Sequence, residues 1–159
     1  MIAGSDAYED GSVRASGHWS EMDNLSNAAR SALMSRVRAQ NTAPELIVRS
    51  LLHSLGYRFR LHRNDLPGNP DIVLSKYRTI VFVHGCFWHH HGCRAGLKVP
   101  GTNSSYWQSK FESNKARDRR SRRSLNRMGW RVLTIWECET RKAAKLTERI
   151  TGFLESVTS

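Results

Sequence analysis

The three cysteines of the chain follow two apolar segments that are far apart in the sequence. Cys86 and Cys93 come after TIVFVH at residues 79–84, and Cys138 comes after WRVLTIW at residues 130–136. If these segments are neighbouring parallel strands, their ends meet at one edge of a sheet. The three thiolates can then converge with a loop histidine, and three thiolates with one imidazole are typical of a structural zinc site. The cysteine placement thus predicts a strand pairing and a zinc site together.

The histidine ligand is less well defined, because His89, His90 and His91 are adjacent. We choose His91, which lies two residues before Cys93. The alternative is that the cysteines are ordinary buried side chains, which are common in protein cores. An odd number of cysteines fits a disulfide framework poorly and fits a cytoplasmic metal site well.

The remaining pattern predicts a single α/β domain over residues 25–159, preceded by a flexible N-terminal tail at residues 1–24. We expect helices over residues 27–39, 43–55, 107–128 and 142–156, and strands over 57–61, 71–74, 79–84 and 130–136. Thr42 and Glu45 form a capping box before the second helix, and Gly56 ends it. This order of elements predicts a mixed sheet flanked by helices.

Charge indicates the class of partner. The net charge is +11 and the pI is about 10.3, which favours nucleic acid over other partners. No apolar run is long enough for a membrane span, so we expect no membrane association. Much of the excess positive charge lies in the expected helix over residues 107–128. Its basic residues either contact phosphate or form an ordinary solvated face. These residues are Lys110, Lys115, Arg117, Arg119, Arg120, Arg122, Arg123 and Arg127.

Two acidic positions point to a catalytic metal. Pro70-Asp71 begins one strand and His84 ends the next, an arrangement similar to that of restriction-endonuclease-like nucleases, in which a carboxylate holds Mg²⁺ beside the scissile phosphate. Val83-His84-Gly85 replaces the usual second acidic motif, so only the Val83 backbone carbonyl could bind metal there. A lone Pro-Asp also commonly closes a turn.

The second position is Asp118, in the middle of the expected basic helix. Asn114 and Asp118 lie on the same stripe as Trp107, Phe111, Ser121, Leu125 and Met128. An inward-facing carboxylate needs a partner or a metal, because burying a lone charge is costly. Asp118 therefore either pairs with a neighbouring arginine or belongs to a site.

At this point the chain resembles the very short patch repair (Vsr) family of DNA mismatch endonucleases. The resemblance is carried, in order, by TAPELIVRSLLHSLGYRFRLH, LPGNPDIV, IVFVHGCFWHHHGC and a last segment running from KVPGTNSSYWQ to WRVLTIWEC. It implies a restriction-endonuclease-like mixed sheet with a structural zinc site. It also implies a Mg²⁺-dependent endonuclease that nicks DNA 5′ of the thymine of a T:G mismatch, the product of 5-methylcytosine deamination.

The resemblance also implies roles for single residues. The zinc ligands would be Cys86, His91, Cys93 and Cys138. One or two Mg²⁺ ions would be bound by Asp71 and the Val83 carbonyl. The active site would further contain His84, His89, Glu45, Asp118 and Asn114. The rings that enter the base stack would be Phe87, Trp88 and Trp107.

Chemically, His89 is our preferred general base, because an ordinary histidine suits proton transfer at neutral pH. His84 would then donate to a phosphate oxygen, and Glu45 would hold a metal-bound water; the assignment of base between the two histidines stays open. We expect a monomer in the bacterial cytoplasm, near the nucleoid, with mismatch-repair proteins as further candidate partners. The competing hypotheses are a broad-specificity mismatch or structure-specific nickase and a catalytically idle, zinc-dependent DNA-binding module.

Overall fold

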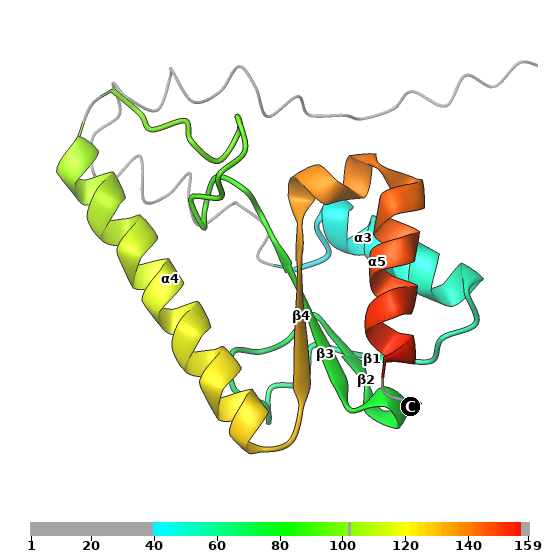
Figure 1. Ribbon diagram of the computed structural model, residues 1–159. Helices are drawn as coiled ribbons and strands as arrows, with labels where there is room; N and C mark the ends of the chain where they lie inside the picture. Colours follow the sequence, from blue (N-terminus) through cyan, green and yellow to red (C-terminus); the bar gives the residue numbers. More distant parts are fainter. Residues whose placement is uncertain (1–39, 102, 157–159) are drawn as a thin grey trace, which may run out of the picture.

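A four-stranded mixed sheet lies between helices on its two faces (Figure 1). The computed structural model describes residues 40–101 and 103–156. The strands lie in the order β1 (Arg60–Leu61), β2 (Ile72–Leu74), β3 (Thr79–His84) and β4 (Arg131–Trp136). The first two pairings are antiparallel and β3 pairs with β4 in parallel, with His84 opposite Trp136. The predicted parallel pairing is confirmed.

Alternate residues of the strands form two apolar layers. On one face, α3 (Ala43–Ser54) and α5 (Ala143–Glu155) pack with Ile72, Leu74, Val81, Leu133 and Ile135. On the other face, α4 (Ser104–Arg127) contributes Leu125 to a cluster with Val73, Ile80, Phe82 and Val132. Because successive side chains of a strand point to opposite faces, burial on both faces requires the continuous apolar runs of β2 and β3.

Short 3-10 helices and tight turns connect these elements. η1 (Ser75–Tyr77) joins β2 to β3, and Arg78 after it has a left-handed backbone. η2 (Glu137–Arg141) follows β4 and leads into α5. Residues 85–103 connect β3 to α4 and contain no helix or strand among their described members.

Several expected boundaries were wrong. The strand expected over 57–61 is reduced to Arg60–Leu61, because Tyr57 and Phe59 pack on the core from irregular chain. Met128 caps the end of α4 and is 47% exposed, so the buried stripe stops at Leu125. Leu46, Ile47 and Leu55 are also exposed, since α3 buries only the narrower stripe of Glu45, Val48 and Leu52.

Two expectations lie outside the described residues: the helix over 27–39 and the tail at 1–24. The described helices include none that is both long enough and apolar enough to cross a bilayer.

Candidate active site and metal centre

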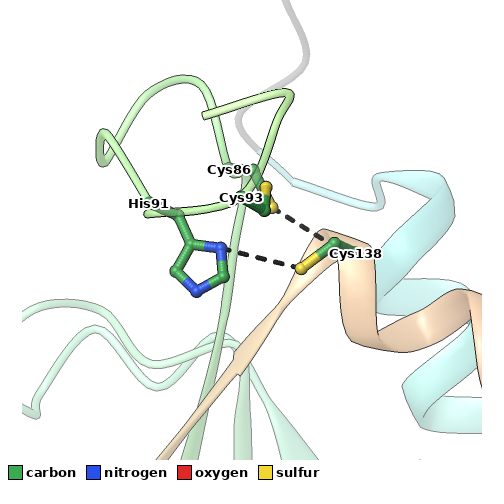
Figure 2. A group of neighbouring side chains, drawn as sticks. All are labelled: Cys86, His91, Cys93 and Cys138. Atoms are coloured by element: carbon green, nitrogen blue, oxygen red, sulfur yellow. Dashed lines mark hydrogen bonds between the residues drawn. The ribbon is translucent and has the colours of Figure 1, made fainter. Parts of the chain in front are cut away.

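The loop after β3 and the end of β4 bring all three cysteines together with His91 (Figure 2). One potential ligand atom from each of Cys86, His91, Cys93 and Cys138 lies within 4.8 Å of all the others. The Cys138 sulfur is 3.6 Å from Nδ1 of His91, and the Cys138 backbone N–H donates to the Cys86 sulfur at 3.4 Å. All three thiols are free of disulfides. Three sulfurs and one ring nitrogen match the donor set of a structural zinc site.

The protein around this group holds the ligands in place. The His91 ring stacks on Trp136 with centroids 4.2 Å apart, and the Cys86 backbone N–H donates to Glu137 at 3.2 Å. Gly96 is required for the loop to close, because a Cβ there would lie 2.1 Å from the His91 carbonyl oxygen. Burial raises the pKa of the Cys86 thiol to about 12. A bound cation would remove that penalty on the thiolate.

A second group, which includes the last residue of β3, contains His84, His89 and Asp118. Asp118 Oδ2 is 2.5 Å from Nδ1 of His89 and 4.0 Å from Nδ1 of His84. The two imidazole rings stack with centroids 3.9 Å apart and planes 6° from parallel. The inward-facing carboxylate predicted on the helix is thus paired with a histidine rather than with an arginine.

The charges of this group follow from its burial. Burial, with the neighbouring His89, lowers the pKa of His84 to about 4, so that ring is neutral at neutral pH. Burial tends to raise the pKa of Asp118, but the hydrogen bond from His89 outweighs it and keeps that carboxyl ionised. An ionised Asp118 accepts the Nδ1 proton of His89, which leaves a lone pair on Nε2. His89 can therefore accept a proton from a water molecule on that side.

The third group contains Glu45, His62 and Asp71, whose potential ligand atoms also lie within 4.8 Å of one another. Asp71 Oδ2 accepts the Val83 backbone N–H at 2.7 Å, which holds the carboxylate beside the end of β3. Burial raises the pKa of Asp71 to about 6, an effect that the Val83 N–H opposes and the nearby Glu45 increases. Two converging carboxylates supply the hard oxygen ligands that Mg²⁺ prefers. Sequence analysis found Glu45 and Asp71 but not His62.

Glu45 lies at the start of α3, where it has a capping role as well. Its carboxylate accepts the Asn41 backbone N–H at 3.0 Å, and Glu45 N–H donates weakly to Thr42 at 3.5 Å. Arg49, one turn later, donates to Glu45 Oε2 at 2.7 Å. Glu45 is 2% exposed. The reciprocal hydrogen bonds differ from the predicted capping box because the carboxylate reaches Asn41 rather than the Thr42 amide.

Asn114 lies outside these three groups. Its side-chain amide donates to the Trp88 carbonyl at 2.7 Å, and Arg117 donates to its oxygen at 2.9 Å. The residue therefore ties the loop to α4. The aromatic residues of the loop pack in the same region: Phe87 makes edge-to-face contacts with Trp88, Trp107 and Phe111 at 5.2–5.5 Å. Trp107 is 2% exposed and Phe87 is 9% exposed, whereas Trp88 is partly exposed.

Helix α4 carries eight basic and two acidic residues. Six of the basic side chains are arginines, all of them exposed. Asp118, one of the two acids, is used inside the site. The excess of positive charge therefore lies on the same helix as Asp118, and it forms a surface suited to phosphate.

Comparison with known proteins identifies the family. The family model for DNA mismatch endonuclease Vsr matches residues 22–95. A type II nicking enzyme, V.XorIIP of Xanthomonas oryzae pv. oryzae, is 53% identical over 84% of this chain and 97% of its own length. The DNA mismatch endonuclease Vsr of Escherichia coli strain K12 is 46% identical over 80% of this chain and 82% of its own length.

Among solved structures, the catalytic domain of homing endonuclease I-Bth0305I has a similar fold, with a TM-score of 0.51. It is 23% identical, and the match covers 75% of this chain and all of that domain. This supports the predicted restriction-endonuclease-like α/β architecture. The sequence matches to the two relatives establish that the chain belongs to the Vsr family of DNA mismatch endonucleases.

Proposed function

We propose that this protein is a Mg²⁺-dependent nicking endonuclease that acts at T:G mismatches in double-stranded DNA. It cuts the strand 5′ of the mismatched thymine and so starts short-patch repair of deaminated 5-methylcytosine. The observation that carries the proposal is that Asp71 and the His89–Asp118 pair lie at the same end of β3. A carboxylate suited to a metal ion and a histidine suited to accept a proton, both at one strand end, support a site for a single phosphate.

The residues have distinct roles in this reaction. Asp71 and the Val83 carbonyl would hold Mg²⁺, which neutralises charge on the scissile phosphate and on the leaving oxygen when bound. His89 accepts the proton of the attacking water through Nε2, while Asp118 holds the opposite ring nitrogen as a donor. This fixes the tautomer in which His89 is competent as a base. His84, neutral at working pH, donates its single N–H to a phosphate oxygen as charge develops there.

The zinc group has no open position when all four protein ligands are used, so its role is structural. Cys86 is two residues from His84, and His91 is two residues from His89. A metal bound by Cys86 and His91 would therefore hold the chain on both sides of His89, and its anchor at Cys86 would lie two residues after His84.

Mismatch recognition is assigned to Phe87, Trp88 and Trp107. Insertion of apolar rings at a base step costs about a few kcal/mol. This cost is lowest at a base pair that is easy to unstack. Trp88 is the most exposed of the three and would make the first contact. Phe87 and Trp107 are packed against each other in the free protein, so their insertion requires the loop to move. The arginines of α4 would contact the flanking phosphates.

The test uses labelled duplexes that are identical except at one base pair. Zinc-loaded protein is incubated with T:G, each other mismatch and the matched pair, with and without Mg²⁺. The expected result is nicking of the thymine strand of the T:G duplex, and only when Mg²⁺ is present. Equal nicking of the other mismatches would indicate a broad-specificity nickase, and binding without nicking would indicate a DNA-binding module.

A further inference from the structure

His62 has no role in the function described above, yet it faces the two carboxylates of the candidate Mg²⁺ site. It follows the short strand β1, which pairs with β2, and its backbone N–H donates to the Asp71 carbonyl at 3.4 Å. Its φ is +45°, a left-handed conformation that is uncommon for residues other than glycine. Such conformations persist where surrounding contacts enforce them, and they concentrate at functional sites.

The orientation of the His62 ring follows from its contact with Arg49. Nη2 of Arg49 lies 2.9 Å from Nε2 of His62 and 2.7 Å from Oε2 of Glu45. A guanidinium can only donate, so Nε2 is the acceptor and its lone pair points into the group. One positively charged nitrogen therefore already lies within bonding distance of two groups that could bind a metal ion.

The guanidinium is not fully satisfied in this position. Arg49 is 11% exposed, and its Nε is buried with no hydrogen-bond partner among the described residues. A buried N–H without a partner carries a desolvation penalty. Arg49 thus provides the positive charge that Glu45 and Asp71 require, but one of its own N–H groups stays without a hydrogen bond. A metal ion that binds the same groups without this penalty could displace it.

We propose that Nε2 of His62 joins Glu45 and Asp71 as a ligand of a divalent-cation site, in which the Arg49 guanidinium takes the place of the ion until the ion binds. This rests on the proposed function for the site of Asp71 and adds a nitrogen ligand to it. Mg²⁺ keeps an all-oxygen environment, whereas first-row transition ions, Mn²⁺ included, also accept an imidazole nitrogen. The protein should therefore bind Mn²⁺ more tightly than Mg²⁺.

The experiment measures metal binding directly, without DNA. Zinc-loaded full-length protein is titrated with Mn²⁺ and followed by the electron paramagnetic resonance signal of free Mn²⁺, with Mg²⁺ as competitor. His62→Gln keeps an oxygen that can accept from Arg49 and can bind a hard cation, but it removes the ring nitrogen. We expect Mn²⁺ affinity to fall about tenfold or more, with Mg²⁺ affinity changed far less.

The matched control is His53→Gln, at an exposed histidine in the last turn of α3, which should change neither affinity. Arg49→Met removes the competing charge and should tighten Mn²⁺ binding severalfold. Unchanged Mn²⁺ binding in His62→Gln, or unchanged or weaker binding in Arg49→Met, would overturn the proposal. Zinc content is measured for every variant, so that loss of the Cys/His site is recognised.

The result is separable from the proposed nicking activity. His62-dependent Mn²⁺ binding in a protein that never nicks DNA would support the cation site and contradict the nuclease function. Mg²⁺-dependent nicking by the wild-type protein, together with Mn²⁺ binding that is the same in His62→Gln, would support the function and contradict the cation site.

Discussion

Replacing Asp71 by asparagine should stabilise the metal-free fold at neutral and alkaline pH while it removes the catalytic metal site. Burial raises the pKa of this carboxyl to about 6, and the charge of Glu45 adds to the effect. An ionised Asp71 is thus a source of instability in the metal-free fold, and a bound cation would relieve it. Asparagine keeps an oxygen to accept the Val83 N–H, which Asp71 accepts at 2.7 Å, and it carries no charge.

The sign and size follow from linkage. The ordinary pKa is 3.8 and the pKa in the fold is about 6, so the folded state binds the proton more tightly. The wild-type protein is therefore most stable, with respect to this group, below pH 3.8, and that contribution is lost as pH rises through 6. The full difference corresponds to about 3 kcal/mol of unfolding free energy. About 1.4 kcal/mol of it falls between pH 8 and pH 5.

Urea denaturation of both zinc-loaded proteins at several pH values between 5 and 8, in buffers freed of other divalent ions, measures this difference. Zinc ligands and other histidines are common to both proteins, so their titration cancels. The unfolding free energy of Asp71→Asn should exceed that of the wild type, and this difference should shrink by about 1.4 kcal/mol from pH 8 to pH 5. Added Mg²⁺ should stabilise only the wild type. An advantage that does not vary with pH would refute the burial argument.

Further predictions concern the other groups. Cys138→Ser should lower the zinc content and the thermal midpoint, measured by elemental analysis and calorimetry; full zinc retention would remove Cys138 from the ligand set. Asp118→Asn should slow nicking by roughly 10²–10⁴-fold with little change in DNA affinity, by analogy with other carboxylates that orient a catalytic histidine; unchanged nicking would contradict the role of the His89–Asp118 pair. Gly96→Ala should destabilise the zinc loop by about 1–3 kcal/mol, seen by denaturation, whereas Gly92→Ala, with open space around it, should not.

The group of Cys86, His91, Cys93 and Cys138 could be predicted from sequence because its members lie in one loop and directly after one strand. Only the pairing of β3 with β4 had to be inferred, and the continuous apolar runs of both segments indicated it. Asp118 was found because it is a carboxylate on a helical stripe that predicts burial, and such a charge needs a partner. Asp71 was found from a different pattern, the Pro-Asp that begins one strand beside the strand that ends at His84.

His62 could not be found in this way. It is the last residue of the segment TAPELIVRSLLHSLGYRFRLH, which carries the family resemblance but gave this histidine no role. Only the pairing of β1 with β2 brings it to Asp71. One sequence signal could have pointed to His62: it directly follows a strand, and that strand lies next to a predicted metal ligand. The exposure of Leu46 and Ile47 could not be predicted either, because helical periodicity alone does not distinguish a narrow buried stripe from a broad one.

The most direct test of the account is the position and metal dependence of the cut in a T:G duplex compared with its C:G counterpart. Both strands are end-labelled in separate reactions, and products are resolved at single-nucleotide length under single-turnover conditions. The account predicts one nick, immediately 5′ of the mismatched thymine, which requires Mg²⁺ and is lost in Asp71→Asn. Equal cutting of the C:G duplex, or cutting that persists in Asp71→Asn, would contradict it.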